Sequence, residues 1–279
     1  MVDRVIDFRN GAKPARTILE SEPHMIVRSV DQGWTVVFHT THGLLAQRIA
    51  SCLHDARELP YWFETQVAIG LHDDLHRVFE KGEREYLTEA GAPRDFTLVP
   101  MQDDKRAAET QNRIDEAFRK HSWLGVLQSK HADCLYRGED TTPEMQQMLD
   151  GESQRREAAL TRLRIEPTLV QKTYDWMHLC DRLSLILCGD DVPAMHRRLE
   201  IITNVGGTRF ELWQDDTECI RIAPWPFADE TVTLSVEYRT LKQLSYADDA
   251  ELGEALKACP VEVRTIVMSD GAIGGADKG

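Results

Sequence analysis

The spacing of apolar positions changes twice along the chain. Near the N-terminus, the runs HMIVRSV and WTVVFHT flank a short turn at Asp31-Gln32-Gly33 and predict a β-hairpin. From about residue 40 to residue 190, apolar residues recur at steps of three and four, which predicts helices. After residue 200, the runs RFELWQ, ECIRIAP and TVTLSVEYRTL look like antiparallel strands. The pattern therefore predicts a mainly α fold with a small antiparallel β-sheet, in the α+β class.

The helical part divides into five predicted helices. Thr41 is a suitable N-cap for the first of them, which carries His42, Leu45 and Ile49 on one stripe. An irregular connection over residues 81–104 separates the second helix from the third. The later helices are expected at about 61–73, 105–136, 144–164 and 168–188. We expect the late strands to join the N-terminal hairpin and to cap one side of this helical core.

These elements predict a single domain over residues 23–268. Its helical core lies at about 40–190 and its C-terminal strands at about 200–240. Residues 1–22 are polar and are expected to form a flexible lead-in. Residues 269–279, rich in Gly and Asp, are expected to form a disordered tail.

Composition narrows the classes of partner. The formal net charge is −14 and the pI about 5.2, which argues against binding nucleic acid or anionic membranes through a basic face. No apolar run approaches the roughly 18–20 residues of a membrane span, and the N-terminus lacks the apolar stretch of a secretory signal. The six cysteines are scattered without a C-x-x-C pair, as in reduced proteins. We expect a cytoplasmic protein whose partner is a small molecule, and a phosphorylated one is compatible with these charges.

Polar residues interrupt the apolar helical stripes at three places. The stretch VAIGLHDDLH ends an apolar run in His72, Asp73 and Asp74. His42 lies on the stripe of the first helix, and Asp181 lies in the apolar run LCDRLSLILC. Burying such groups without partners is costly, and a first-row divalent ion accepts imidazole and carboxylate together. The order of these residues predicts a metal site formed by His42, His72, Asp73 and Asp181.

Three further residues are candidates for roles at this site. His131, in QSKHADCLY, is a candidate additional ligand or proton donor, and Asp74 is an alternative group for handling the proton. Arg182, beside Asp181, is a candidate for stabilising the charge of an anionic substrate. His121 lies ten residues before His131, which on one helix means about 15 Å of rise and about 80° of rotation. The two histidines therefore cannot bind the same ion from a single helix.

Each of these residues also has an ordinary explanation. A histidine on an apolar helix face is usually a core residue with satisfied hydrogen bonds. A buried aspartate usually caps a helix or pairs with an arginine. The HDDLH stretch alone is compatible with a solvated helix end. Only the combined order, across three helices, favours a metal.

Five stretches together resemble the bacterial DUF3891 family, whose function is unknown. The resemblance extends from about residue 25 to residue 268. The stretches are MIVRSVDQGWTVVFHTTHGLLAQRIA, VAIGLHDD, VLQSKHADCLY, CDRLSLILC and IAPWPFADETVTLSVEYRTL.

The order H…HD…D also resembles the HD-domain superfamily of metal-dependent phosphohydrolases. That resemblance implies an HD-domain-like helical core with His42, His72, Asp73 and Asp181 as the four ligands of the metal. The superfamily also contains diiron oxygenases with two further histidines before the last Asp. This chain has His121 and His131 in that interval, but on one predicted helix. The sequence after the HD pair reads HDDLHR and lacks the Gly-Lys that often follows it.

Three hypotheses for function follow. The first is an HD-like metalloenzyme that hydrolyses a small phosphorylated molecule with bound Mn, Fe, Co, Ni or Zn. The second is an iron-dependent oxygenase, with one or two irons and His131 as an added ligand. The third is a non-catalytic helical binding module in which the polar cluster is structural.

Overall fold

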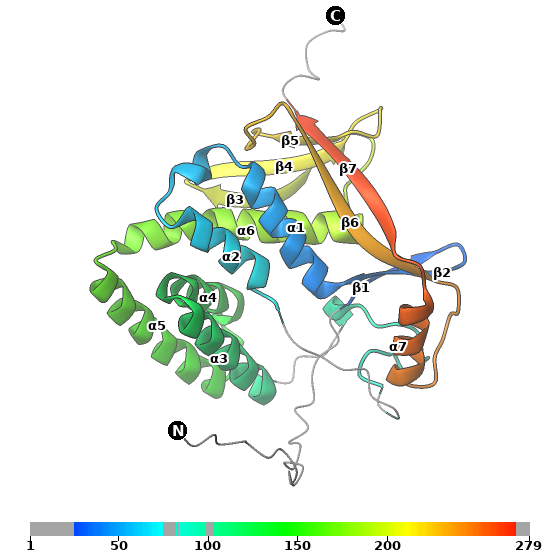
Figure 1. Cartoon of the computed structure of the whole chain (residues 1–279), viewed down its shortest axis with the longest axis horizontal. Helices are drawn as coiled ribbons and strands as arrows, with labels where there is room; N and C mark the ends of the chain where they lie inside the picture. Colours follow the sequence, from blue (N-terminus) through cyan, green and yellow to red (C-terminus); the bar gives the residue numbers. More distant parts are fainter. Residues whose placement is uncertain (1–24, 75–81, 83, 99–102, 272–279) are drawn as a thin grey trace, which may run out of the picture.

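Helices occupy the middle of the chain, and strands occupy both of its ends (Figure 1). The computed structural model describes residues 25–74, 82, 84–98 and 103–271. The α-helices of these residues are α1 (His39–Cys52), α2 (Trp62–Leu71), α3 (Asp103–Lys120), α4 (Ser122–Tyr136), α5 (Pro143–Leu163), α6 (Pro167–Gly189) and α7 (Asp249–Ala258). The strands are β1 (Met25–Val30), β2 (Gly33–Phe38), β3 (Leu199–Val205), β4 (Thr208–Gln214), β5 (Ile220–Ala223), β6 (Thr231–Leu241) and β7 (Glu262–Asp270). None of the helices in these ranges is both long and apolar enough to cross a membrane.

The flexible segments predicted at the two ends of the chain lie mainly outside the described residues. The lead-in predicted over residues 1–22 lies outside the described residues, and so do residues 272–279 of the predicted tail. Residues 269 and 270 are not tail, because they belong to β7.

The sheet is larger than the small antiparallel sheet predicted from the sequence, so that prediction is wrong. It has seven strands in the order β1-β2-β6-β7-β5-β4-β3. It is also mixed, because β5 pairs in parallel with β7 while the other neighbours are antiparallel. The N-terminal hairpin is confirmed, with Met25 opposite Phe38, and it joins the late strands through β2 and β6 as expected.

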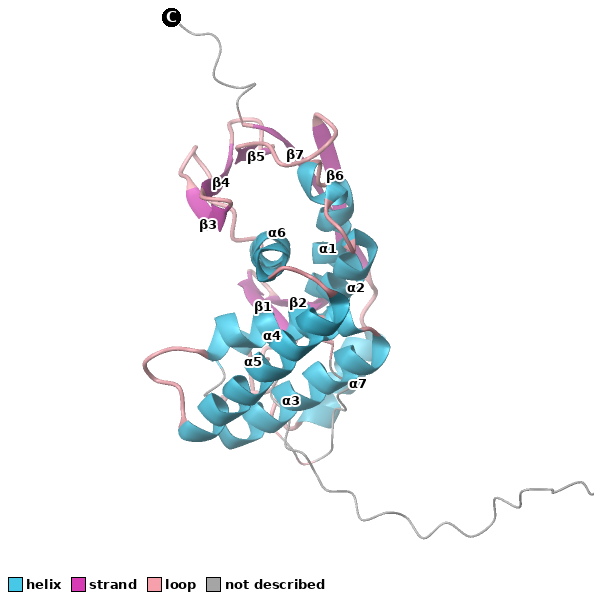
Figure 2. Ribbon diagram, turned by 90° about the vertical axis from the view of Figure 1, so that its left-hand side faces the viewer, coloured by secondary structure: helices cyan, strands magenta, loops and turns pink. Residues whose placement is uncertain are grey.

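The sheet curls around α6, which Figure 2 shows end-on inside the arc of strands. Thirteen of the 23 residues of α6 are buried, on more than one side of the helix, as expected for a helix enclosed by its neighbours. Its apolar residues share one core with the inner faces of the strands, including Leu212, Leu234 and Met268. The strands thus hold α6, and with it Asp181, in the interior.

The long helix predicted over residues 105–136 is instead two helices, α3 and α4. Between them His121 takes an extended conformation (φ −162°, ψ 139°), and its imidazole accepts a hydrogen bond from the Trp123 N–H at 3.2 Å. Gly125 allows the fold-back, because a Cβ there would lie 2.2 Å from Cγ of Phe118. The chain therefore reverses at His121 and packs α4 against α3.

The connection between α2 and α3 is attached to the rest of the molecule by two aspartates. Asp249, buried at the start of α7, accepts hydrogen bonds from the N–H groups of Glu85 (2.8 Å) and Tyr86 (3.0 Å). Asp95 accepts one from the N–H of Val27 in β1 at 2.7 Å. Next to it, the ring of Phe96 lies 4.5 Å from the ring of His39. This connection therefore places the ring of Phe96 against the N-terminus of α1.

Candidate metal centre

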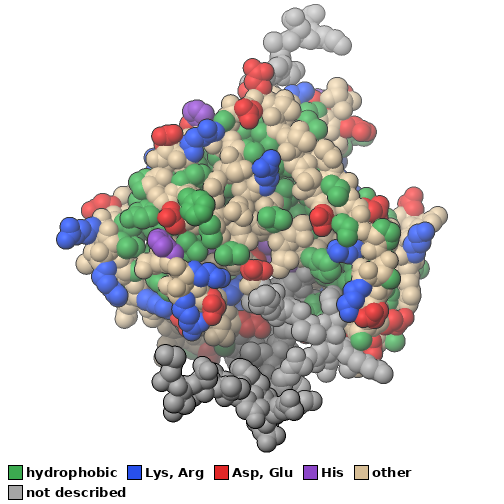
Figure 3. Space-filling view, in the orientation of Figure 1, with side chains coloured by type: hydrophobic (Ala, Val, Ile, Leu, Met, Phe, Trp, Pro, Cys, Tyr) green, Lys and Arg blue, Asp and Glu red, His purple; other side chains and the backbone are tan. Residues whose placement is uncertain are grey.

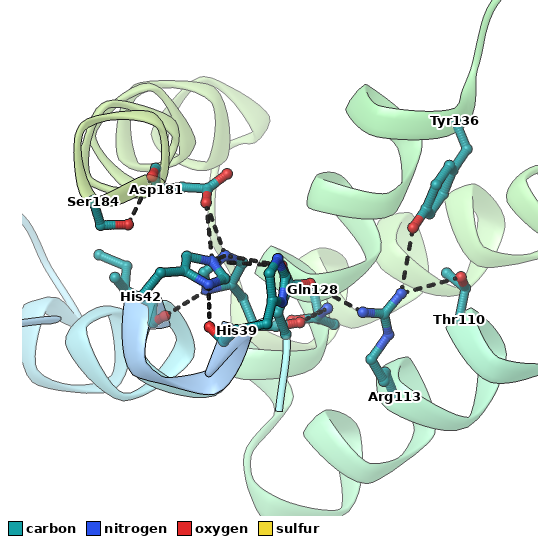
Figure 4. A network of polar contacts seen from close by, with 11 residues as sticks. His39, His42, Thr110, Arg113, Gln128, Tyr136, Asp181 and Ser184 are labelled. Carbon is teal, nitrogen blue, oxygen red and sulfur yellow. Dashed lines mark hydrogen bonds and ion pairs between the residues drawn. The ribbon is translucent and has the colours of Figure 1, made fainter. Parts of the chain in front are cut away.

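Four side chains converge at one point, from α1, from the end of α2 and from α6. His42 comes from the first turn of α1, His72 and Asp73 directly follow α2, and Asp181 comes from the middle of α6. Figure 4 shows Asp181 pointing from its helix toward His42, with His39 beside them. The sequence predicted these four residues as ligands, and the structure brings their side chains together.

The distances between their polar atoms fit a metal site. Nε2 of His42 lies 3.1 Å from Nε2 of His72, and Oδ1 of Asp181 lies 3.1 Å from His72 Nε2 and 3.4 Å from His42 Nε2. Oδ2 of Asp73 lies 3.5 Å from Nε2 of His42 and 3.6 Å from Nε2 of His72. Ligand atoms about 2.1 Å from a tetrahedral ion lie about 3.4 Å from one another. The five distances therefore leave room for one ion at the centre of the four atoms.

Backbone carbonyls fix the orientation of both imidazoles. The Nδ1–H of His72 donates to the carbonyl of Ile69 at 2.6 Å, and that of His42 donates to the carbonyl of His39. Protons on these two Nδ1 atoms leave both Nε2 atoms facing the cluster with lone pairs available. Metal-binding histidines are usually held in this way, through the ring nitrogen that does not bind the metal.

Without a metal, the carboxylates and the protonated imidazole of the cluster stabilise one another electrostatically. Burial acts to lower the pKa of His72, but the carboxylates of Asp73 and Asp181 outweigh it and raise this pKa to about 9. Burial acts in the opposite direction on Asp181, yet His72 and His42 hold the pKa of this carboxyl well below its usual range. A proton on His72 thus occupies the place that a cation would take.

Asp73 is also paired with a cation outside the cluster. Arg113 of α3 donates from Nη1 to Oδ1 of Asp73 at 3.0 Å, and its Nη2 lies 3.4 Å from both the Thr110 and the Tyr136 hydroxyls (Figure 4). Burial would raise the pKa of Asp73, but His72, His39 and Arg113 together hold it below the usual range. One oxygen of this carboxylate thus faces the imidazoles and the other faces the guanidinium.

Two more histidines flank the four central residues. Nδ1 of His39 lies 3.9 Å from Oδ2 of Asp73, and the ring of His131 on α4 lies 5.1 Å from the ring of His72. Each takes part in a group of three potential ligand atoms within 4.8 Å of one another, with His42 and Asp73 or with His72 and Asp73. Burial and the neighbouring imidazole charge lower the pKa of His39 to about 3 and that of His131 to about 4, so both are neutral at pH 7.

His131 has one ring nitrogen in use and one available. Its Nδ1 lies 3.2 Å from the Tyr174 hydroxyl, while its buried Nε2 has no hydrogen-bond partner among the described residues. A buried polar atom without a partner is unusual in a native fold and needs an explanation, such as an ion or water. This atom makes His131 a candidate additional ligand, as the sequence predicted, and a candidate proton acceptor, whereas the sequence analysis named it as a proton donor.

The other predicted site residues lie outside the cluster. Asp74 is exposed and belongs to none of the groups of potential ligands. Arg182 is exposed, and its Nε donates to the carbonyl of Ile201 in β3 at 2.9 Å, so it fastens α6 to the sheet. His121 is exposed and caps α4. His76, another histidine near the HD pair, lies outside the described residues.

Sequence reasoning missed three residues of this site: His39, Arg113 and Gln128. Gln128 donates from Nε2 to the carbonyl of His72 at 2.8 Å and so supports the HD pair from α4. The signal for His39 was its place three residues before His42, which puts both imidazoles on one face of a helix. Arg113 gave no comparable signal, because it lies among other charged residues of α3.

Comparison with known proteins identifies a family without assigning an activity. A family model described as "Protein of unknown function (DUF3891)" matches residues 25–243. Neither a curated protein nor a solved structure matches the chain. The matched region contains all six histidine and aspartate residues of the cluster. The chain therefore belongs to the DUF3891 family.

Proposed function

We propose that the protein is an HD-like metalloenzyme that hydrolyses a small phosphorylated molecule. The observation that supports this most is the set of five distances, from 3.1 to 3.6 Å, among His42, His72, Asp73 and Asp181. These residues occur in the order H…HD…D that resembles metal-dependent phosphohydrolases, and their donor set suits a first-row divalent ion.

Several residues of the chain would each have a separate role in hydrolysis. When bound, a divalent ion supplies polarisation of a phosphoryl oxygen and a lowered pKa for a bound water. Arg113 holds Asp73 in place and presents positive charge on the side of the cluster toward α3. His131 is neutral at pH 7, and its unpartnered Nε2 can accept a proton from an attacking water. Tyr174 holds the other nitrogen of this imidazole.

Elemental analysis by ICP-MS tests the metal centre directly. Protein purified without a His-tag or chelator is expected to carry near-stoichiometric Mn, Fe, Co, Ni or Zn. The double variant His72→Ala/Asp73→Ala should lose this metal, because it removes two of the four ligands. The chain offers a matched control in His54→Ala/Asp55→Ala, an adjacent His-Asp pair whose side chains are 68% and 78% exposed. This control should keep the metal.

Metal-loaded protein should then release phosphate from small phosphate esters, and the His72→Ala/Asp73→Ala variant should not. A wild-type protein that takes up none of the five metals would contradict the proposal. That result would favour the non-catalytic module, with the buried polar cluster acting only in the fold.

The nitrogen-rich surroundings support a second candidate, an iron-dependent oxygenase. The specific observation is the pair of neutral imidazoles of His39 and His131 flanking the centre, since imidazole suits iron. Iron-loaded protein prepared without oxygen would then change its visible spectrum on exposure to air. Loss of that change in His131→Ala, with the iron content kept, would favour oxygen chemistry over hydrolysis.

A further inference from the structure

A cavity of about 250 Å³ lies between α2, α3 and α4, beside the metal centre. Each helix contributes residues three or four positions apart, which therefore share one face of that helix. The apolar part of the lining is Ala68 and Leu71 of α2, Ala117 of α3 and Leu124 of α4, and the polar part is Asp74, Asn112, Arg113, Glu116, Lys120 and Gln128. The cavity thus offers a small apolar wall beside several polar and charged groups.

Two residues of the cavity wall also hold the HD pair. Arg113 donates to the carboxylate of Asp73, and Gln128 donates to the carbonyl of His72. Among the four central residues, Asp73 is the most exposed, with 19% of its side chain accessible, against 0% for both histidines and 9% for Asp181. Solvent therefore approaches the centre on the side of Asp73, where Arg113 joins the centre to the cavity.

The charges of the cavity suit one anionic group at its inner end. The buried Nε–H of Arg113 has no acceptor among the described residues, although its other nitrogens are engaged. The lining also carries the cation of Lys120 and the carboxylates of Asp74 and Glu116, whose formal charges sum to −1. These three groups therefore do not favour a second phosphate or a polyanion. Figure 3 shows Lys and Arg side chains gathered over α3 and α5 on this face of the molecule.

We propose that this cavity is the substrate site of the metal centre and takes a small organic monophosphate. The phosphoryl group lies at the inner end, next to the Arg113–Asp73 pair, where the Nε–H of Arg113 donates to it. The carbon skeleton packs against Ala68, Ala117 and Leu124. This inference rests on the proposed function, because it places the substrate relative to the metal.

Calorimetric titration of the metal-loaded protein tests this assignment with two probes. Inorganic phosphate reports on the inner end alone, and phenylphosphonate adds a ring that must occupy the cavity. Ala117→Phe fills the cavity and should weaken phenylphosphonate binding about tenfold or more, while phosphate binding changes less than about threefold. Ala108→Phe adds the same ring to the exposed face of α3 and should change neither affinity. If the Phe variant does not fold, Ala117→Leu makes the same test with a smaller side chain.

Arg113→Gln should weaken both probes by about tenfold or more, since it removes the charge that meets the anion. Its metal content is measured in parallel, so that a loss of phosphate binding is not confused with a loss of metal. Equal affinity for phenylphosphonate in wild type and Ala117→Phe would overturn the inference. Metal-loaded wild type that binds neither probe would overturn it too, while leaving the metal centre in place. Absence of metal would instead refute the proposed function.

Discussion

Two neutral imidazoles do not hold their Nε2 lone pairs 3.1 Å apart without a positive charge between them. The Nδ1 protons of His42 and His72 are committed to backbone carbonyls, so the positive charge must come from a proton or a metal at Nε2. Without metal, the proton on His72 fills this role, because its pKa is raised to about 9. A metal that binds here must therefore displace that proton.

This competition predicts how metal affinity depends on pH. His72 is protonated below its pKa of about 9 and must lose one proton to become a ligand. The affinity should therefore rise about tenfold per pH unit between pH 7 and pH 9, and level off above that. A chelator competition titration at several pH values measures it. An affinity that stays constant over this range would show that His72 is not a ligand.

The metal-free protein should show the opposite trend with pH. The folded pKa of His72 lies above the ordinary value of 6.5, so the folded state binds the extra proton. Its contribution to the free energy of unfolding is complete below pH 6.5 and is lost as the pH rises through about 9. Urea unfolding of chelator-treated protein measures this contribution, and the free energy of unfolding should be lower at pH 9 than at pH 6.5. It serves as the control for the metal titration, because both experiments report the same proton on His72.

At this scale, the sequence predicted the central residues better than their surroundings. An aspartate in LCDRLSLILC stands out because the neighbouring positions are apolar, and the same holds for the HD pair after VAIGL. Arg113 does not stand out, since α3 is rich in charged residues and only its packing selects this one. Site residues on polar helices therefore require the tertiary structure to be found.

At the scale of elements, the close approach of α1 and α2 sets the distance between His42 and His72. Gly43, next to His42, faces the carbonyl oxygen of Gly70, two residues before His72. A Cβ at residue 43 would lie 2.8 Å from that oxygen, which belongs to the backbone and cannot rotate away. The two helices can therefore hold their histidines in contact only with a glycine here.

Gly43→Ala is expected to push α1 and α2 apart. The overlap should lower the free energy of unfolding by about 1–3 kcal/mol. Metal affinity should fall about 10- to 100-fold, the range for changes around a ligand that leave the ligand itself in place. Urea unfolding and a chelator competition titration measure the two effects.

Gly151→Ala is the matched control for Gly43→Ala. Gly151 lies within α5, and a Cβ there meets no atom within 4 Å. The change should raise the free energy of unfolding by about 0.5–1 kcal/mol through helix propensity, without affecting the metal. Unchanged metal affinity in Gly43→Ala would mean that helix spacing does not set the geometry of the site.

The helices differ in how well the sequence predicts them. The span of α6 follows closely from its apolar run, and that of α5 from its periodicity between Pro143 and Leu163. The break at His121 was missed because apolar spacing continues from α3 into α4. The fold-back after α3 places Gly125 against the ring of Phe118, a contact that periodicity does not record.

At the scale of the whole molecule, β7 joins the two halves of the sheet. Strands β1, β2 and β6 form one half, strands β3, β4 and β5 form the other, and β7 pairs with both β6 and β5. The family match ends at residue 243, before α7 and β7. The region matched by the family model therefore lacks a strand from the middle of the sheet.

A chain that ends at Gln243 is expected to lose cooperative unfolding. It lacks β7 and leaves inward-facing residues of β6, such as Leu234 and Val236, without their neighbour strand. Thermal unfolding followed by circular dichroism tests this, with a chain ending at Gly271 as the control that keeps every described strand. A cooperative transition at the wild-type midpoint in the shorter chain would contradict it.

The size of the sheet was underestimated because two strands, β3 and β7, were not predicted, and β7 does not alternate cleanly. Ile266 and Met268 face the core, but Val263 and Val267 on the opposite face are 59% and 44% exposed. Apolar side chains on both faces blur the period of two by which a half-buried strand is detected. The class α+β could be predicted, whereas the number of strands depended on pairings between distant segments.

The place of β7 after the other described strands also bears on the order of folding during biosynthesis. A ribosome releases β6 before β7, so the two halves of the sheet stay unjoined until residues 262–270 have been made. The helices that position the four metal-site residues, α1, α2 and α6, are all made before that point and contact one another directly. Packing of the helices around the site can therefore begin on the nascent chain before the sheet is complete.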